Sequence, residues 1–435
     1  MRLKGLQWFL GWAIGVSGAG RLLWVAALLS AAWPPSQAHG IEADSTEVAA
    51  LKEEVRALRG MVESLRGRAP SDSTTADADT VAVLSSPALA SSSSPAGSAP
   101  QQASNLMNPN VSVIGHFQGR MGDDLSPGER AFSFGEAELG FQAPVDPYAR
   151  ADFFIAVSPD EGVDLEEGYL TFLALPGGVS AKLGKFRANL GKFNRTHPPE
   201  TPFADRPLST LAFLGEEGLS GSGLSLSVLI PNRWVYLNLD AEATTTWEGA
   251  SAFGEQGDDG EVKAGGRKRD LGYLGRLSTY LDLGESANFT LGASYATGVH
   301  DPAGRARTHV ENLDATFRWK NPRRAIYRSV VWQTEVLFGQ RRIGGGGTAS
   351  RKGLFSYVDW QCDRRWHLGG RFDYTQFPDV TGNESGGLGF ITFTPSEFSL
   401  ISVQLKGVRR TDGSWQRTAI LKLTFNIGPH GAHPF

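Results

Sequence analysis

Basic side chains gather in one stretch of the chain, between residues 185 and 206. The stretch contains Lys185, Arg187, Lys192, Arg195, His197 and Arg206. Rings of Arg and Lys around a narrow aqueous passage favour anions, so these residues are candidates for a channel constriction. However, residues 187–217 carry four Lys or Arg and also four carboxylates, at Glu200, Asp205, Glu216 and Glu217. The preferred ion is therefore left open, and Arg187 could equally pair with a carboxylate on a strand.

Few other residues could carry chemistry. His430 and His433 have an i, i+3 spacing that suits metal ligands, but without a third ligand nearby they are better explained as part of a disordered tail. The run Gly344–Gly347 is not followed by the Lys-Ser/Thr pair of a phosphate-binding loop. The sequence contains no HExxH, no CxxC and no nucleophile elbow. We therefore expect no enzyme activity, no cofactor and no metal site.

Composition narrows the class of protein further. The net charge is −4, and we find no basic patch interleaved with aromatic residues, so nucleic-acid binding is not expected. The single cysteine, Cys362, excludes an intramolecular disulfide. A protein exported to an oxidising compartment without disulfides can be stabilised by a closed sheet instead.

The elements that would position these residues are β-strands with alternating faces. In the last of them, Ala419–Ile427, apolar residues alternate with Lys422, Thr424 and Asn426. Two earlier segments place polar residues on one face in the same way: Glu136, Glu138, Arg150 and Asp152. Repeated carboxylates would be costly in the dry core of a soluble sandwich but not in a wet lumen. We therefore predict that Glu136, Glu138, Arg150, Asp152 and Lys422 face the lumen of a membrane barrel.

Sixteen such segments are predicted, and most have the roughly nine to eleven residues that a tilted membrane strand needs. They lie near 110–120, 131–142, 148–157, 164–174, 179–187, 218–230, 233–244, 270–282, 287–297, 308–320, 328–341, 353–361, 366–376, 386–394, 398–410 and 415–427. Short turns follow the even strands, whereas longer polar loops such as 188–217 tend to follow the odd ones. This segregation of loop lengths is typical of outer-membrane barrels and predicts one at residues 108–435, with its short turns in the periplasm.

Three further segments precede the predicted barrel. Residues 1–38 have the charged start, apolar stretches and small-residue ending of a secretory signal peptide, although a retained membrane anchor is the alternative. Residues 41–68 carry a heptad pattern from Val48 to Leu65, which predicts a periplasmic coiled coil, or else a solvated helix without a partner. Val and Leu at the seam favour two strands, whereas a porin assembly would need three. Residues 69–107 are a Ser/Ala/Pro-rich linker that we expect to be disordered.

The run Gly184–Gly191 resembles the GxFKxxxG-style motif of the phosphate-selective porins of the O/P family, and the predicted topology is similar across residues 108–427. The resemblance implies a trimer whose third extracellular loop, here 188–217, folds into the lumen as a constriction. The sequence departs from the usual ending of such barrels, because Gly428–Pro434 interrupts the alternation before the terminal Phe435.

Together these patterns predict an all-β protein of the Gram-negative outer membrane. Its function would be a porin-like channel for passive diffusion of small hydrophilic solutes or ions, filtered by the third loop. Its partners would be membrane lipid, the transported solutes and further copies of the chain, with a trimer favoured. Two alternatives stay open: a substrate-selective channel, for anions or a metal-related solute, and a non-conducting structural barrel.

Overall fold

The computed structural model describes residues 109–428 except 124–129, 160–161, 250–251, 257–261, 264–268, 301–305, 322–326, 343–346 and 378–381. The predicted signal peptide (1–38), coiled coil (41–68) and linker (69–107) lie outside the described residues. So do the tail histidines, His430 and His433. The described part of the chain contains no helix that is long and apolar enough to span a membrane.

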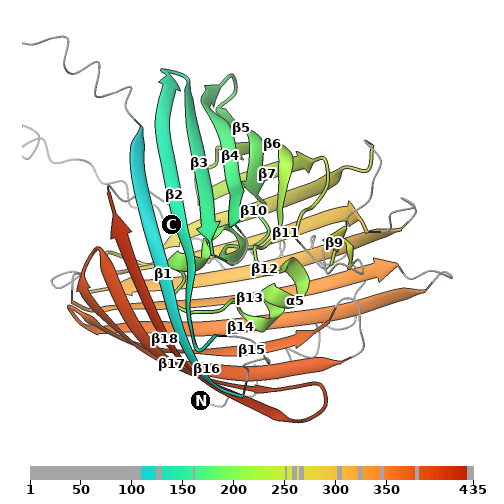
Figure 1. Ribbon diagram of the computed structural model, residues 1–435. Helices are drawn as coiled ribbons and strands as arrows, with labels where there is room; N and C mark the ends of the chain where they lie inside the picture. The colour runs from blue at the N-terminus through green and yellow to red at the C-terminus, as the bar shows by residue number, and fades with distance from the viewer. Residues whose placement is uncertain are drawn as a thin grey trace, which may run out of the picture. The chain divides into compact units, whose positions relative to one another are not determined.

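Sixteen antiparallel strands form one closed barrel, in which each strand pairs with its neighbours along the chain and β1 closes against β18 (Figure 1). The strands are β1 (Asn110–Gly122), β2 (Phe132–Asp146), β3 (Ala149–Ser158), β4 (Gly162–Leu175), β5 (Val179–Arg187), β6 (Ser220–Leu229), β7 (Tyr236–Thr244), β10 (Gly272–Asp282), β11 (Ala287–Val299), β12 (Arg307–Lys320), β13 (Ser329–Arg342), β14 (Thr348–Asp363), β15 (Trp366–Gln376), β16 (Asn383–Ser396), β17 (Ser399–Arg409) and β18 (Trp415–Ile427). The short strands β8 (Glu255–Gln256) and β9 (Val262–Lys263) form a separate pair. The predicted fold class and strand number are confirmed.

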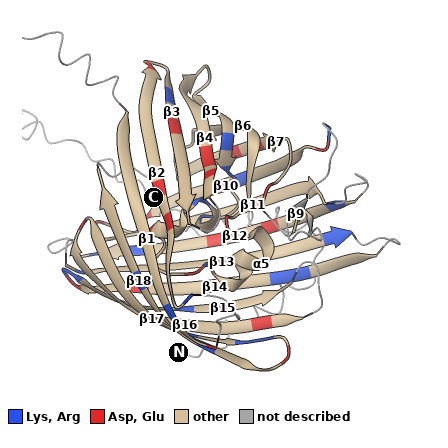
Figure 2. Cartoon of the chain, in the orientation of Figure 1, with Lys and Arg blue, Asp and Glu red and all other residues tan. Residues whose placement is uncertain are grey.

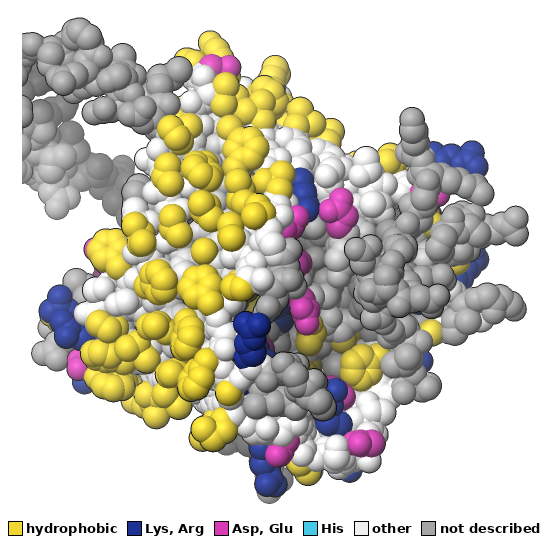
Figure 3. Space-filling model, in the orientation of Figure 1, with side chains coloured by type: hydrophobic (Ala, Val, Ile, Leu, Met, Phe, Trp, Pro, Cys, Tyr) yellow, Lys and Arg dark blue, Asp and Glu magenta, His cyan; other side chains and the backbone are white. Residues whose placement is uncertain are grey.

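Alternation along each strand separates an apolar outer face from an inner face. In β18, Leu421, Phe425 and Ile427 are exposed, whereas Lys422 and Thr424 are buried inside. Hydrophobic side chains cover much of the visible outer face over the first and last strands (Figure 3). Exposed aromatic residues lie near both ends of the barrel, among them Tyr148, Trp234, Trp366, Phe132 and Trp415. An apolar band between aromatic girdles is the surface that a barrel presents to lipid.

The connections differ in length between the two ends of the barrel. Those after β2, β4, β14 and β16 are tight turns, and β1 begins and β18 ends on the same side, since Val113 pairs with Ile427. We call this side the short-turn end. The other side, the long-loop end, carries the connections 188–219 and 245–271.

The connection between β5 and β6 contains two 3-10 turns, η1 (Phe193–Arg195) and η2 (Pro198–Glu200), and one helix, α5 (Leu208–Leu214). We call residues 188–219 the inner loop. In Figure 1, α5 lies within the ring of strands, in front of β13 and β14. It contacts β13, β14 and β15, on the far side of the barrel from β5. The sequence had not predicted a helix in this loop.

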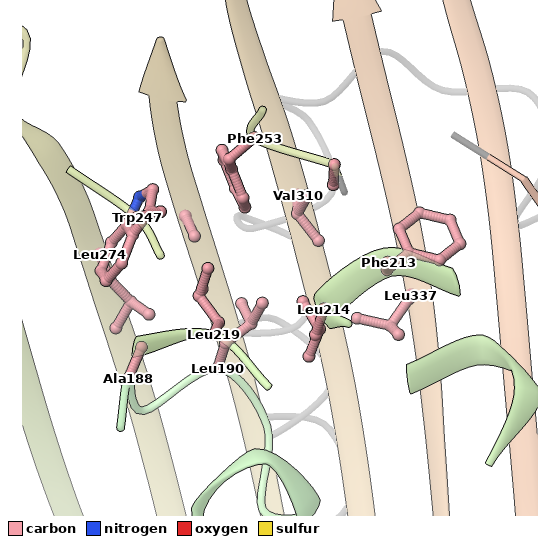
Figure 4. Packing of buried hydrophobic residues seen from close by; sticks show 12 residues of the cluster. Ala188, Leu190, Phe213, Leu214, Leu219, Trp247, Phe253, Leu274, Val310 and Leu337 are labelled. Carbon is pink, nitrogen blue, oxygen red and sulfur yellow. The ribbon is translucent and has the colours of Figure 1, made fainter. Parts of the chain in front are cut away.

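Apolar side chains of the inner loop fill part of the interior. Phe213, Leu214 and Leu219 form a buried cluster with Leu337 of β13 and Val310 of β12 (Figure 4). Trp247 and Phe253, from the connection after β7, extend the cluster toward β10. A second cluster joins Phe193 and Phe203 to four wall residues, namely Phe355, Tyr357, Leu388 and Phe390. The interior is therefore not lined by polar residues alone, because the inner loop supplies hydrophobic residues that cover apolar positions of the wall.

Candidate functional site

The middle of the inner loop is held by the last strands of the barrel. Lys422 of β18 donates hydrogen bonds from Nζ to the carbonyl oxygens of Thr201 at 2.6 Å and Phe203 at 2.9 Å. On β17, Gln404 Oε1 accepts a hydrogen bond from the Ala204 amide at 3.0 Å, and its Nε2 donates to the Pro202 carbonyl at 3.1 Å. Strand side chains thus replace the water that would otherwise hydrate these loop amides and carbonyls.

The loop is also fixed at other points of the barrel wall. Glu335 of β13 accepts hydrogen bonds from the Lys192 and Phe193 amides at 3.0 and 2.7 Å. Arg371 of β15 donates to Oδ1 of Asp205 at 3.1 Å, and Lys406 Nζ lies 2.6 Å from Oδ2 of the same carboxylate. The inner loop therefore crosses the barrel and contacts strands from several sides of the wall.

A buried charged cluster surrounds His197 near the start of the barrel. His197 Nδ1 lies 2.7 Å from Oε2 of Glu166 and 3.1 Å from Oε2 of Glu138. Its Nε2 lies 3.1 Å from Oε2 of Glu167. Arg187 donates from Nη2 to Oε1 of Glu166 at 2.6 Å, and its backbone amide donates to Oε1 of Glu167 at 2.6 Å. All five side chains are less than a tenth exposed.

The two adjacent glutamates face inward because β4 contains a β-bulge. Phe154 of β3 pairs with Glu167, but the next residue, Ile155, pairs with Leu165, so Glu166 is an extra residue in β4. Strict alternation would place one of the two carboxylates on the lipid-facing side, where charge is costly. A bulge re-aims a side chain, and here it brings both carboxylates to His197.

The carboxylates control the charge of His197. Burial by itself lowers the pKa of this imidazole, but Glu138 and the hydrogen-bonded Glu166 raise it well above its ordinary value. Both ring nitrogens face carboxylate oxygens, so an imidazolium donates a proton on each side. The inner loop therefore carries a buried positive charge that pairs with β2 and β4.

On the short-turn side of the inner loop lies a cavity of about 960 Å³ that we call the vestibule. Basic side chains from the loop, from β12 and from the turn after β14 line it: Lys192, Arg195, Arg318, Arg364 and Arg365. The carboxylates that line it are Glu200 and Glu397. Burial and the nearby Arg318 and Arg195 guanidinium groups lower the pKa of Lys192 to about 8. The vestibule therefore carries more positive than negative charge.

A second hollow, of about 400 Å³, lies toward the long-loop end. It is lined by Asp270, Arg307 and Arg342, together with His309 and Gln340. The structure thus has a cavity near each end of the barrel.

Figure 2 shows Lys, Arg, Asp and Glu on many of the strands that form the wall.

The residues proposed for a constriction fall into three places. Lys192 and Arg195 line the vestibule, whereas His197 and Arg187 lie in the buried cluster. Arg206 is buried beside this cluster and donates from Nη2 to the Glu217 carbonyl oxygen at 3.1 Å. Lys185 lies apart from both, with its Nζ 3.8 Å from Asp164 and 3.6 Å from Glu248. The six residues therefore do not form one ring.

The residues predicted to face the lumen occupy the inner side of β2, β3 and β18. Glu138 contacts His197, and the partly buried Glu136 lies close to Glu166 and Arg187. On β3, Arg150 pairs with Asp152 at 2.7 Å. Lys422 is fully covered by the inner loop. Glu166 and Glu167 were not predicted as site residues, although two adjacent charges on a membrane strand are a signal of a bulge.

The chain has one relative of known sequence with substantial identity among the proteins compared with it. An uncharacterized protein of Aquifex aeolicus (strain VF5) is 32% identical over 357 residues, which cover 74% of this chain and 72% of that protein. The two chains belong to one family. No protein-family model matches the chain.

Solved structures of outer-membrane proteins are similar to this barrel. An anion-selective porin from Comamonas acidovorans superimposes with a TM-score of 0.51 at 9% identity, covering 74% of this chain and 99% of the porin. The outer membrane channel DcaP of Acinetobacter baumannii has a TM-score of 0.48 at 10% identity, covering 74% and 96% of the two chains. At such low identity the likeness to the Comamonas protein concerns the fold alone. The chain therefore has a porin-like sixteen-stranded barrel fold.

Proposed function

We propose that this chain is a porin-like channel of the Gram-negative outer membrane, through which small hydrophilic solutes diffuse passively. The apolar outer band, with aromatic residues near both ends, fits a lipid bilayer. The main support is that the barrel is closed and has a cavity near each end, the vestibule and the second hollow. A polar segment of the inner loop lies between its walls. Solutes would pass beside the inner loop, which acts as the filter.

The charge of the vestibule favours anions in this channel. Lys192, Arg195 and Arg318 line a common cavity with Arg364 and Arg365, against the carboxylates of Glu200 and Glu397. Field lines focus in a cavity with low-dielectric walls, so this excess raises the local anion concentration. The anion selectivity of the Comamonas porin, which shares the fold, agrees with this preference. Phosphate is the first anion to test, because of the motif-level resemblance at Gly184–Gly191.

The segments before the barrel would serve export and assembly. Residues 1–38 direct export, residues 41–68 form a periplasmic coiled coil, and residues 69–107 link it to the barrel. With this orientation the short-turn end faces the periplasm, so the vestibule opens inward. A trimer would combine the barrel contacts with the coiled coil, which is too short to hold an assembly alone.

The channel is tested with folded, purified protein in a planar lipid bilayer. We expect discrete conductance steps and, in a salt gradient, a reversal potential that indicates anion preference. Migration of unheated and heated samples on a gel gives an independent check that the barrel is folded. Folded protein that produces no steps would contradict the proposal.

A second candidate is a barrel that does not conduct in its resting form. The observation that favours it is the hydrophobic cluster around Phe213, Leu337 and Phe253, which fills part of the interior. In that case the intact protein would stay silent in the bilayer, and only variants with a loosened inner loop would conduct. Comparing Lys422→Met with the unmodified chain separates the two candidates.

A further inference from the structure

The His197 cluster has the geometry of a metal-binding site. Glu138, Glu166 and His197 each offer one ligand atom, and these atoms all lie within 4.8 Å of one another. Metal–ligand bonds of about 2.0–2.2 Å place neighbouring ligand atoms roughly 3 Å apart. His197 Nδ1 lies 2.7 Å from the Glu166 oxygen and 3.1 Å from the Glu138 oxygen. The donor atoms are therefore close to the separation that a shared ion requires.

The surrounding residues orient these donors as in known metal centres. A histidine ligand usually donates its second ring N–H to a carboxylate, which fixes the ring and raises its basicity. Here Nε2 faces Oε2 of Glu167 at 3.1 Å, which leaves Nδ1 directed at Glu138 and Glu166. Arg187 holds the other oxygen of Glu166 at 2.6 Å, so that Oε2 remains directed at the histidine. Phe154 packs against the imidazole, with ring centroids 5.2 Å apart.

The position of Nδ1 between two carboxylates favours a bound cation. Oε2 of Glu138 is buried and lies 3.1 Å from Nδ1 of His197, but this nitrogen lies closer to Oε2 of Glu166, at 2.7 Å. A single N–H cannot donate fully to both oxygens, whereas a metal ion is bound by several ligand atoms at once.

We propose that Glu138, Glu166 and His197 bind a divalent transition-metal ion, with Glu167 orienting the histidine. One imidazole nitrogen and two carboxylate oxygens suit Zn²⁺ or Mn²⁺ better than Mg²⁺ or Ca²⁺, which prefer ligands that are all oxygen. The ion replaces the proton on Nδ1 and joins β2, β4 and the inner loop at one point. The site does not depend on conduction, so it can be tested whether or not the channel proposal holds.

The test uses the full-length folded protein in detergent, stripped with a chelator and then titrated with Zn²⁺ by calorimetry. All variants carry His430→Ala and His433→Ala, so that the C-terminal histidines cannot contribute. We expect one Zn²⁺ per chain in this background. Glu138→Gln and His197→Gln should each lose that binding. Glu167→Gln should bind about 10- to 100-fold more weakly, as expected for a residue that orients a ligand.

The matched control is His367→Gln, because His367 pairs with Asp359 at 3.1 Å on another part of the wall. This variant should retain one Zn²⁺ per chain. Titrations in buffers of different ionisation enthalpy should show that binding releases a proton, since the metal takes the place of the Nδ1 proton. Absence of binding at millimolar Zn²⁺ in folded background protein would overturn the proposal. Unchanged binding in His197→Gln would also overturn it.

Discussion

Lys422 donates a hydrogen bond to the carbonyl oxygen of Thr201 at 2.6 Å, although 221 residues separate the two along the chain. The same ammonium group also donates to the carbonyl oxygens of Phe203 at 2.9 Å and Pro199 at 3.3 Å. A lysine on the last strand thus holds the middle of the inner loop through backbone oxygens alone. This contact makes the position of the loop depend on closure of the barrel.

Replacing Lys422 with Met should release the loop from β18. Methionine has a similar length but cannot donate a hydrogen bond, so several buried carbonyl oxygens lose their partner. Each buried group left without a hydrogen bond costs on the order of 1–3 kcal/mol of folding stability. We expect a lower urea midpoint of unfolding and larger, noisier conductance steps in a bilayer. Lys320→Met is the control, since Lys320 lies exposed at the end of β12. Identical traces for the two variants would show that Lys422 does not position the loop.

The strands of this barrel were predictable from sequence because their signals are local. Residues 421–427 alternate between apolar and polar side chains, and the predicted range of this strand, 415–427, equals the observed β18. Turn lengths gave an independent indication, which the topology confirms. The same local reasoning misplaced the start of β14, which begins at Thr348 rather than near 353, because its first residues do not alternate clearly.

The charged site was less predictable, because it depends on two non-local features. The bulge at Glu166 changes which side chains face inward, and only the pairing with Phe154 and Ile155 reveals it. The vestibule collects Arg318 from β12 and Arg364 and Arg365 from the turn after β14, which are far from the inner loop in sequence. Spacing within 185–206 could not show that Arg195 and Arg206 lie in different environments.

Arg195 and Arg206 should therefore differ in their effect on ion selectivity. Arg195 lines the vestibule, so Arg195→Gln should lower the anion-to-cation permeability ratio roughly two- to five-fold, equivalent to about 0.5–1 kcal/mol of lost attraction. Arg206 is buried against the Glu217 carbonyl, and Arg206→Gln should leave the ratio unchanged. Reversal potentials in a salt gradient measure both. A larger shift for Arg206→Gln would place the filter in the buried cluster instead.

Selectivity should also depend on pH through Lys192. Burial, together with Arg318 and Arg195, lowers the pKa of Lys192 to about 8. Below this value the ammonium adds a positive charge to the vestibule, and above it the amine is neutral, so anion preference should decrease as the pH rises through about 8. Reversal potentials at a series of pH values give the midpoint. Lys192→Met should remove this step, and a step that persists in the variant would assign it to another group.

Replacing Gly353 of β14 with Ala should destabilise the protein, because α5 packs directly against this position. A Cβ atom built there would lie 2.6 Å from Cβ of Ser209 and 3.2 Å from Cε2 of Phe213, so Gly353→Ala must push α5 away from the wall. Overpacking of this kind costs about 1–3 kcal/mol, which should lower the urea midpoint of unfolding. Gly389→Ala on β16 is the matched control, because a Cβ there meets nothing within 4 Å. Equal midpoints for the two variants would mean that α5 can shift at no cost, so that the inner loop would be a movable element and not a fixed filter.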